Sequence, residues 1–483
     1  MEKISWFIII LSAVLLVVMP GTVQGMYHSP PPAVPDAYFN PPVKIPNPEP
    51  RSGSLFGFFT SGLEIDGDIV IISDRTKFDR LNSIAGVAYL FNCSEDPCVL
   101  LDTLHAGNDF GYAVGISDSN VLVGAPGNRA AYLYDCEDAI DAGDGSVPCE
   151  DPIEILPPEP ATANGSFGYF VAISGNTIVI SETSTNGDIL RTYNVFIYTC
   201  DGGICDLEDI LSDPDGFPSR FGSSVTIDED LVVVGDLRGH NAYFYDCTNF
   251  PCSSPERLIP NAIGEFGWTT SISGDTVVVA NRAGVVNVYD CSTTPCTFVM
   301  TLSNQNLNGF GYDVDIYDEN ILVSDFGANI AFLFDSSTGE LLNTFSNPGV
   351  SNSWFGSVVA ISETNLIIGA QQDTSDSVPR AGAAYYYTKV TPSQQIDELI
   401  LKVTDLAPSN LKDSQINGLI AKLNNVNEKI EKEQATAAIN QLYSFINQMN
   451  GFVKAGKIPS EQALLCIDDA NTIVTNIQGI YDI

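Results

Sequence analysis

The sequence predicts a mainly β protein: a seven-bladed β-propeller followed by a small α-helical C-terminal domain. Three observations lead to this fold. A pattern of Phe, Gly and Ile recurs seven times along the chain. Each copy contains short alternating or continuous apolar runs, which favour β-strands. After residue 393 Gly and aromatic residues become rare, and apolar side chains recur at steps of three and four, as in amphipathic helices.

The first 25 residues are predicted to be a secretory signal peptide. Residues 4–19 carry no charge, Lys3 precedes them, and small residues at Val23 and Gly25 mark a cleavage site. The alternative is a retained membrane anchor, but a spanning helix needs about 20 apolar residues, and Pro20 ends this run early. No later segment is long and apolar enough to span a membrane. Residues 26–53 form a Pro-rich leader, which favours an extended conformation.

The repeat has three fixed positions. The first is a Phe, at Phe59, Phe110, Phe167, Phe221, Phe266, Phe310 and Phe355, and Gly follows it in every copy except the first, where Thr60 stands. The second, six residues later, is Ile65, Ile116, Ile173, Ile227, Ile272, Ile316 and Ile361. The third is a small residue eight positions further, at Ser73, Gly124, Ser181, Gly235, Ala280, Ser324 and Gly369. We expect the small residue to let neighbouring blades approach closely near the axis.

Each copy predicts four short antiparallel strands. The first ends at the Ile, and a polar turn such as residues 273–275 leads to a continuous apolar strand such as residues 277–279. The third strand is aromatic, as in residues 243–245, and a weaker fourth strand fills the period. Seven such copies describe the blades of a propeller. The fourth strand of the last blade comes either from the leader around residues 42–46 or from residue 390 onwards.

The Phe-Gly pair, the two strands after it and the run Gly124-Ala125-Pro126 resemble the FG-GAP repeat of integrin α-chain propellers and of many secreted microbial proteins. The resemblance covers residues 54–393, and it implies a binding or adhesion protein. Integrin-type repeats hold calcium in a loop of alternating Asp and Asn residues between the first two strands. Here that space holds short turns such as residues 118–120. The chain is therefore similar to the short, metal-free variant, and no cofactor is predicted.

Ten of the 11 Cys fall as five local pairs, which are Cys93 with Cys98, Cys136 with Cys149, Cys200 with Cys205, Cys247 with Cys252, and Cys291 with Cys296. Each pair flanks the turn between the third and fourth strands, and two Cys that face each other across a hairpin suit a disulfide in an oxidising compartment. A metal knuckle is the alternative, but the pairs lie in separate blades and lack His partners. By loop-closure entropy each clasp contributes about 2 kcal/mol.

Three smaller features complete this part of the chain. Cys466 is left over in an apolar helical stretch and is predicted to be a buried free thiol. Asn92 and Asn164 begin glycosylation sequons and are candidate sites in a cell that glycosylates. The loop 138–144 is the best metal candidate, but its Asp spacing of three does not match the alternate-residue ligands of an EF-hand. No metal site is therefore assigned.

The charge is unevenly distributed. Residues 26–393 carry 13 basic and 48 acidic side chains, a net charge of −35. The loops that join the second strand to the third hold eight acids and eight basic residues, and the basic ones are Arg75, Lys77, Arg80, Arg129, Arg191, Arg238, Arg282 and Arg380. In an antiparallel blade these loops share one face, and the polar turns and Cys clasps share the other. The sequence thus predicts one near-neutral, arginine-bearing face and one strongly acidic face.

Two interpretations of the arginine-bearing face remain open. In the first, neighbouring Asp and Arg residues form ion pairs that only hold the blades together, for example near Asp74 or Asp236. In the second, the face docks an anionic ligand, because Arg suits carboxylate, sulfate and phosphate groups. The candidate ligand-binding residues are then Arg75, Arg80, Arg129, Arg191, Arg238, Arg282 and Arg380. The acidic remainder favours solubility and loosely held cations.

Residues 394–483 predict a four-helix module. The expected helices span 396–406, 416–430, 439–453 and 460–478, and Ser460 after Pro459 is a typical N-cap. Residues 437–448 resemble the FIMAH-type helical modules that end many secreted bacterial and archaeal proteins. The module is a candidate for association with a cell surface. An apolar stripe of this kind is more often a core than a partner site.

Composition and motifs narrow the functional class. The whole chain has 60 acidic and 21 basic residues, which argues against nucleic acid as a partner. The nucleophile-elbow, zinc-protease and phosphate-loop signatures are absent from the sequence. The sequence therefore predicts a secreted or surface-associated, non-catalytic binding protein for an extracellular protein or polysaccharide. A structural component of a cell envelope is the second hypothesis. A carbohydrate-active enzyme with two carboxylates is the third.

Overall fold

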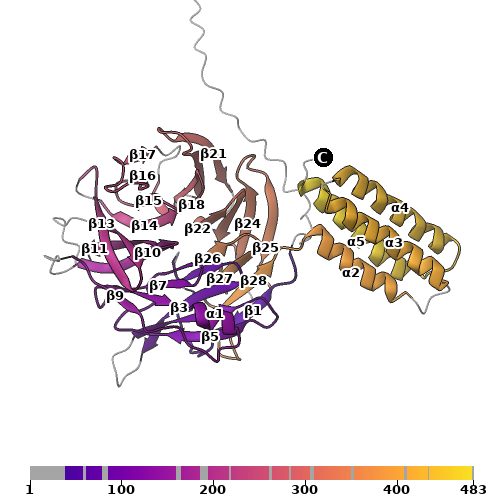
Figure 1. Ribbon diagram of the computed structural model, residues 1–483, viewed down its shortest axis with the longest axis horizontal. Coiled ribbons are helices and arrows are strands. Elements are labelled where there is room, and N and C mark those ends of the chain that lie inside the picture. The colour runs from indigo at the N-terminus through magenta and orange to yellow at the C-terminus, as the bar shows by residue number, and fades with distance from the viewer. Residues whose placement is uncertain are drawn as a thin grey trace, which may run out of the picture.

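The computed structural model describes residues 39–480 except for 58–60, 79–84, 159–164, 185–193, 217–218, 260–263, 282–283, 305–308, 350–352, 407–410 and 433. The predicted signal peptide, and with it most of the leader, lies outside the described residues. The described residues form seven four-stranded antiparallel sheets arranged as blades around an axis, and a bundle of helices follows the last blade (Figure 1). The mainly β fold with a helical C-terminal part is confirmed.

The blades follow one another along the chain, and in each the first strand lies nearest the axis. Blade 1 contains β2(Leu63–Asp66), β3(Ile69–Phe78), β4(Ala85–Asn92) and β5(Val99–Leu104). Blade 2 contains β6(Val114–Ser117), β7(Asn120–Ala125), β8(Ala130–Asp135) and β9(Ile153–Ile155), and blade 3 contains β10(Gly165–Ser174), β11(Thr177–Ser184), β12(Asn194–Asp201) and β13(Ile204–Ser212). Blade 4 contains β14(Phe221–Asp228), β15(Leu231–Asp236), β16(Asn241–Asp246) and β17(Glu256–Leu258).

The remaining blades keep the same order. Blade 5 contains β18(Phe266–Ser273), β19(Thr276–Asn281), β20(Val285–Asp290) and β21(Thr297–Ser303), and blade 6 contains β22(Phe310–Tyr317), β23(Asn320–Asp325), β24(Ile330–Asp335) and β25(Leu341–Ser346). Blade 7 contains β26(Phe355–Ile361), β27(Asn365–Ala370), β28(Ala383–Thr388) and, as its outermost strand, β1(Val43–Pro46). The apolar core lies between neighbouring blades, where β-branched and aromatic side chains of facing sheets pack together.

The Phe-Gly pair forms the seam between blades. The six repeat Phe side chains from Phe110 to Phe355 are fully buried, and Gly168 and Gly267 adopt positive φ angles of 85° and 80°. A Cβ atom on Gly168 would collide with the carbonyl oxygen of Ala130 in the preceding blade. Likewise a Cβ on Gly124, the small residue of blade 2, would collide with the carbonyl oxygen of Gly168. The close approach expected from the small residues is therefore present.

The first copy of the repeat differs from the prediction. Phe56 is fully buried and pairs with Asp74, the residue directly after the small repeat residue Ser73. Phe221 pairs with Asp236, and Phe310 with Asp325, in the same way. Phe56-Gly57 is thus the first Phe-Gly pair, and Gly57 has a φ of 61°. The fixed six-residue spacing pointed to Phe59 and Thr60 instead, because the first copy is three residues longer; those two residues lie outside the described residues.

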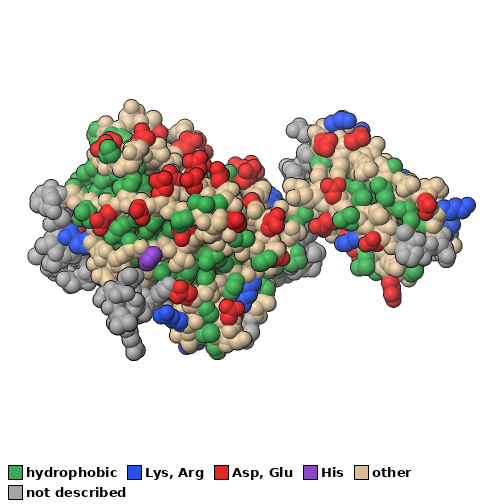
Figure 2. Space-filling view, turned by 60° about the horizontal axis from the view of Figure 1, so that its bottom comes forward, with side chains coloured by type: hydrophobic (Ala, Val, Ile, Leu, Met, Phe, Trp, Pro, Cys, Tyr) green, Lys and Arg blue, Asp and Glu red, His purple; other side chains and the backbone are tan. Residues whose placement is uncertain are grey.

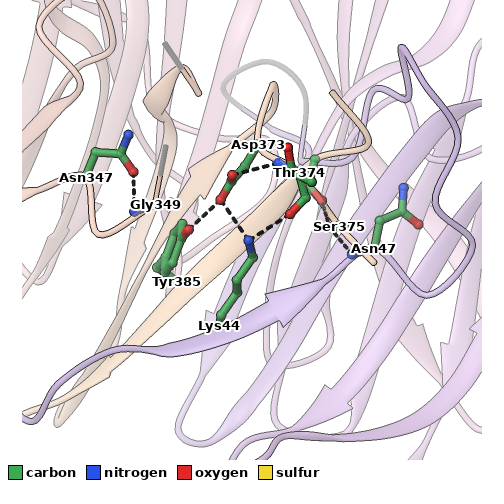
Figure 3. A network of polar contacts seen from close by, with 9 residues as sticks. Lys44, Asn47, Asn347, Gly349, Asp373, Thr374, Ser375 and Tyr385 are labelled. Atoms are coloured by element: carbon green, nitrogen blue, oxygen red, sulfur yellow. Dashed lines mark hydrogen bonds and ion pairs between the residues drawn. The ribbon is translucent and has the colours of Figure 1, made fainter. Parts of the chain in front are cut away.

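The ring is closed by the leader, which settles the alternative left open by the sequence. β1 pairs antiparallel with β28, from Val43 opposite Tyr386 to Pro46 opposite Ala383. Lys44 Nζ lies 3.1 Å from Asp373 Oδ2 and donates to the carbonyl oxygen of Thr374 at 2.8 Å (Figure 3). The propeller therefore begins within the predicted leader.

A second set of contacts supports this closure. The Tyr385 hydroxyl donates to Asp373, which is almost completely buried. The backbone N–H of Asn47 donates to Ser375 Oγ, as Figure 3 also shows. Burial, followed by the hydrogen bond and the charge of Asp373, raises the pKa of Tyr385 well above its ordinary value. The closing strand is thus held by a buried polar network as well as by strand pairing.

Short polar side chains link the turns of neighbouring blades on one face of the ring. The residue after the repeat Ile accepts the backbone N–H of a turn residue in the next blade. The pairs are Asp66 with Asp118 (2.6 Å), Ser117 with Gly175 (2.9 Å), Ser174 with Glu229 (2.9 Å), Asp228 with Gly274 (2.6 Å) and Ser273 with Asp318 (2.9 Å). From blade 7 to blade 1, Ser362 Oγ donates to the carbonyl oxygen of Gly67 at 3.2 Å. Neighbouring blades are therefore in contact at their exposed turns as well as in the apolar core.

The five predicted Cys pairs are confirmed as disulfides. Cys93 is bonded to Cys98, Cys136 to Cys149, Cys200 to Cys205, Cys247 to Cys252, and Cys291 to Cys296. The loop of the second of these disulfides contains the short helix α1(Glu137–Ala142). Cys466 is a buried free thiol, as predicted.

The disulfide clasps lie beside the polar turns. The N–H of the first Cys of a pair donates to the turn between the first two strands of its own blade, as from Cys93 to the carbonyl oxygen of Asp68 and from Cys247 to that of Asp230. The clasps and the polar turns therefore share one face of the ring, which is the arrangement that the sequence predicted.

The C-terminal part folds as the sequence predicts. The described residues after 391 form α2(Pro392–Thr404), α3(Asp413–Ile430), α4(Ala435–Lys454) and α5(Ser460–Ile480). Thr391 caps α2 in a capping box with Gln394. A single apolar cluster between the helices, which includes Leu399, Leu442 and Phe445, forms their core. In the part of the chain that the structure describes, no helix combines the length and apolarity that a membrane crossing requires.

Candidate functional site: the loop face and the axial cavity

Four of the seven arginines proposed as ligand-binding residues lie within the described residues, and they stand on one face of the ring: Arg75 near the end of β3, and Arg129, Arg238 and Arg380 in second-to-third loops. This is the face where the repeat Phe pairs with the end of the second strand, as Phe221 does with Asp236. The loops that lead into each blade and the second-to-third loops both start there. The clasps and polar turns lie at the opposite ends of the strands. Over the side of the molecule in Figure 2, Asp and Glu side chains clearly outnumber Lys and Arg.

Arg75 and Arg129 are held at the seams of blades 1 to 3. The Arg75 guanidinium lies over the ring of Tyr112, 3.7 Å from the ring centre, and so joins blade 1 to blade 2. Arg129 Nη2 lies 3.5 Å from Glu182 Oε1 and joins blade 2 to blade 3. The Glu182 side chain is buried, whereas 30% of the Arg129 side chain is exposed. Both arginines are therefore positioned by neighbouring blades.

The other five arginines are less constrained or lie outside the described residues. Arg238 and Arg380 stand exposed in the second-to-third loops of blades 4 and 7. Arg80, Arg191 and Arg282 lie outside the described residues. The assignment of these residues as ligand contacts stays a prediction.

Asp74 and Asp236, each directly after the small repeat residue of its blade, accept hydrogen bonds from loop residues. Asp236 Oδ1 accepts the N–H groups of Arg220 (2.6 Å) and Gly239 (3.0 Å). Asp74 accepts from the side chain of Asn47 at 3.0 Å and from the N–H of Leu55 at 3.2 Å. Both carboxylates are almost completely buried. They hold the loops from inside the protein, whereas Glu182, at the same repeat position in blade 3, pairs with Arg129.

Aromatic side chains gather on the same face, two positions after the repeat Phe. In blades 2 and 3 these residues are Tyr112 and Tyr169, whose ring centres are 4.2 Å apart, and Phe170 packs on Tyr169 at 5.0 Å. Together with Arg75 they form a first aromatic group, on the side of blades 1 to 3. Burial, followed by the charge and hydrogen bond of Tyr169, raises the pKa of Tyr112 above its ordinary value, so its hydroxyl stays protonated.

A second aromatic group lies on the side of blades 5 to 7. Trp268 and Tyr312 occupy the position two after the repeat Phe in blades 5 and 6. Phe326 belongs to the second-to-third loop of blade 6, and Trp354 precedes the inner strand of blade 7. The two groups are centred on blades 2 and 6, which lie on opposite sides of the seven-bladed ring.

The axis contains a cavity of about 190 Å³ lined by the innermost strands. Its lining is polar on the side of blades 4 and 5, where Ser224, Thr226, Thr269, Thr270 and Ser271 lie, and small or apolar on the side of blades 2 and 3. Three carboxyl groups, from Glu64, Asp313 and Asp315, also line it. Burial, followed by repulsion from Asp315 and Asp313, raises the pKa of Glu64. Burial also raises the pKa of Asp313, and the charge of Asp315 adds to this effect.

Hydrogen bonds fix the two aspartates of β22. Asp313 Oδ2 accepts the N–H of Val359 at 2.9 Å, and Asp313 Oδ1 accepts from the hydroxyl of Thr269 at 3.3 Å. Asp315 Oδ2 accepts the N–H of Ile361 at 2.8 Å, and Asp315 Oδ1 accepts from Ser271 at 2.7 Å. The aspartates therefore tie blade 6 to blades 5 and 7 beside the cavity.

Stability is expected to decrease as the pH rises from 5 to 7.5. Burial raises the pKa of Asp315 to about 6, whereas an Asp in an unfolded chain has a pKa of about 3.9. The folded state thus binds the proton more tightly, and its stabilising contribution is complete below a pH of about 4 and lost as the pH rises through about 6. We expect a loss of about 1 to 2 kcal/mol over this range in urea unfolding followed by tryptophan fluorescence.

The same measurement on two variants tests the assignment. Asp315→Asn removes the titrating group and should flatten the pH dependence. Asp290→Asn is the matched control, because the Ser292 hydrogen bonds lower the pKa of the exposed Asp290, which therefore titrates outside this range. Equal slopes for wild type and Asp315→Asn would assign the pH dependence to other groups.

The loop 138–144 shows no metal-like arrangement. Helix α1 occupies its first part, and Asp144 accepts the N–H of Ser146 at 2.9 Å. Within the described ranges, no three His, Cys, Asp or Glu side chains are close enough together to hold a metal ion. Of the sequon residues, Asn92 ends β4 and accepts the N–H of Ser94 at 2.9 Å. Asn164 lies outside the described residues.

Sequence reasoning missed the aromatic groups and the cavity acids. Each had a signal. The position two after the repeat Phe is Tyr112, Tyr169, Trp268 and Tyr312 in four of the seven copies. The acids Asp313 and Asp315 interrupt a strand that the repeat places on the inside, where a charge is costly. Both signals depend on comparing the copies column by column.

Parts of the chain are similar to known proteins. Residues 346–387 match the FG-GAP repeat family. The β-propeller domain of Myceliophteria thermophila Cps50 (Swd1) is similar at 11% identity over 73% of this chain and 100% of that chain, with a TM-score of 0.48. Chaetomium thermophilum Raptor is similar at 13% identity over 73% of this chain and 29% of that chain, with a TM-score of 0.46. No curated protein matches the chain in sequence.

Proposed function

We propose that the protein is a secreted or surface-associated, non-catalytic protein that binds an anionic polysaccharide on its loop face, the face that carries the second-to-third loops. The chain is a seven-bladed β-propeller that carries the FG-GAP repeat and ends in a helical segment. FG-GAP propellers typically serve as binding scaffolds. The five disulfides favour an oxidising, extracytoplasmic compartment. The helical segment is proposed to associate the protein with a surface.

The arginine pair at the seams of blades 1 to 3 carries this proposal. Arg75 is stacked on Tyr112, and Arg129 lies against Glu182, so both guanidinium groups have defined positions before a ligand binds. A planar guanidinium presents parallel N–H donors that fit carboxylate or sulfate oxygens. Pre-positioning lowers the conformational entropy lost on binding. An anionic chain therefore finds fixed donors here on a protein that is otherwise strongly acidic.

The test uses the mature protein, residues 26–483, and heparin as a sulfated polysaccharide probe. Replacing Arg75 and Arg129 by Glu should raise the Kd about a hundredfold, because two charge-assisted contacts are reversed. Binding to the wild type should weaken as salt is added. Replacing Lys432 and Lys454 of the helical segment by Glu is the matched control and should leave the Kd unchanged. Equal affinity of the Arg75→Glu/Arg129→Glu variant and the wild type would refute the proposed binding face.

A further inference from the structure

Four aromatic rings form a continuous row over blades 5 to 7. The ring centres of Trp268 and Tyr312 are 5.7 Å apart, those of Tyr312 and Phe326 are 4.3 Å apart, and those of Phe326 and Trp354 are 6.2 Å apart. The planes of neighbouring rings meet at 50°, 56° and 72°. We call this row the aromatic platform. It joins three blades through side chains that are only partly buried.

The platform is held in place rather than collapsed into the core. The indole Nε1–H of Trp268 donates to the carbonyl oxygen of Tyr312 at 2.7 Å, which fixes the orientation of the Trp268 ring. Trp354 has a positive φ of 56°, a conformation that costs a bulky residue free energy, and 38% of the residue is exposed. The chain therefore accepts local strain while leaving a large apolar ring in contact with solvent.

Polar atoms behind the platform lack partners within the protein. Asp325 and Ser353 each precede a platform residue in the sequence, and Ser357 lies on β26 three residues after Trp354. All three side chains are at least nine-tenths buried. Among the described residues, Asp325 Oδ2, Ser353 Oγ and Ser357 Oγ have no hydrogen-bond partner. These atoms have almost no solvent-accessible surface, so a ligand rich in hydroxyl groups can satisfy them only through water admitted beneath the rings.

The chemistry of the two aromatic groups differs. The group on blades 1 to 3 already stacks its own cation, Arg75, on Tyr112. In the platform the polar neighbours are hydroxyl groups and a carboxyl group, which are complementary to hydroxyl groups and repel anions. The apolar face of a pyranose ring stacks on an aromatic face, while its hydroxyl groups point sideways, where water can bridge them to such polar neighbours. A neutral sugar thus matches both features of the platform.

We propose that Trp268, Tyr312, Phe326 and Trp354 form a stacking site for a neutral pyranose unit of a polysaccharide. This inference goes beyond the proposed function, because it concerns the half of the loop face opposite Arg75 and Arg129, and it stands whether or not those arginines bind an anion. A glycan that carries both neutral and acidic units would contact both halves.

Tryptophan fluorescence offers a direct readout of the platform. The chain contains three Trp, namely Trp6 in the predicted signal peptide, Trp268 and Trp354. In the mature protein, residues 26–483, both remaining tryptophans belong to the platform. The probes are cellohexaose, mannohexaose and chitohexaose. We expect at least one of them to give a saturable blue shift of the emission, independent of salt concentration.

Variants assign the response to the platform. Trp354→Ala should weaken binding about tenfold, whereas Trp354→Phe, which keeps a flat ring, should retain most of the affinity. Phe298→Ala is the matched control, because Phe298 is 44% exposed on the outer strand β21; it should bind like the wild type. Arg75→Glu should also leave neutral-sugar binding unchanged, so that failure of the arginine proposal is distinguishable from failure of this one.

Two outcomes would overturn the proposal. One is the absence of a saturable change with all three hexasaccharides up to roughly 10 mM, a concentration that detects Kd values in the millimolar range. The other is a saturable response to hexa-arginine but to none of the sugars, which would assign the platform to cation recognition. Affinity unchanged in both Trp354→Ala and a Tyr312→Ala variant, with both folded by circular dichroism, would place the sugar elsewhere.

Discussion

Removal of residues 26–46 from the mature protein is expected to lower the free energy of unfolding of the propeller by about 4 kcal/mol or more. The deletion takes away β1, and with it the buried side chain of Ile45, whose loss alone costs about 2 to 4 kcal/mol. It also removes Lys44 from Asp373, so a buried carboxylate loses its cation. Urea unfolding followed by the emission of Trp268 and Trp354 measures the loss.

A shorter truncation is the control. Removal of residues 26–38 leaves β1 and its neighbour Phe39 in place, and its unfolding midpoint should equal that of the full mature chain. If the two truncated proteins unfold at the same urea concentration, the closing strand contributes nothing to the stability of the ring.

Gly168→Ala is expected to destabilise the propeller by about 3 kcal/mol or more. Alanine is disfavoured at a φ of 85°, which costs about 1 to 2 kcal/mol. In addition, its Cβ would collide with the carbonyl oxygen of Ala130 across the seam, and relieving such a collision by moving backbone costs about 1 to 3 kcal/mol. Thermal and urea unfolding of the variant measure the sum.

Gly175→Ala separates the two contributions. Gly175 also has a positive φ, 53°, but an added Cβ would meet no atom within 4 Å. This control should cost only the backbone share, about 1 to 2 kcal/mol. If both variants lose the same free energy of unfolding, the backbone between blades 2 and 3 moves apart at no cost. The Gly of the Phe-Gly repeat would then be required only for its backbone conformation.

The architecture could be predicted because the repeat encodes it locally. Phe167, Gly168 and Ile173 each have one structural role, and the role returns at the same spacing in nearly every copy. The prediction was wrong only where the spacing changes, at Phe56. Strand pairing across a large sequence separation, such as β1 with β28, leaves no spacing signal, which is why the leader remained one of two alternatives.

The candidate site was harder to predict because it depends on side chains from different blades. That Arg75 stacks on Tyr112, or that Tyr312 meets Phe326, depends on how neighbouring sheets are inclined. The charge count singled out the arginine-bearing loops, but it gave no weight to uncharged aromatic residues. The charge count also treated Asp236 as a surface charge. In the structure this aspartate is buried and accepts hydrogen bonds from backbone N–H groups.

Closure of the ring by β1 determines the order in which the protein can be completed during synthesis. Lys44 precedes its partner Asp373 by 329 residues, so the first strand made must wait for nearly the whole propeller before it can pair. Contacts between distant residues form late, because a long loop must be closed first. Each disulfide hairpin, in contrast, joins residues at most 13 positions apart and can form as its blade emerges. The incomplete chain is therefore an open arc of blades, each clasped locally once it reaches an oxidising compartment, and it becomes a ring only when blade 7 is present.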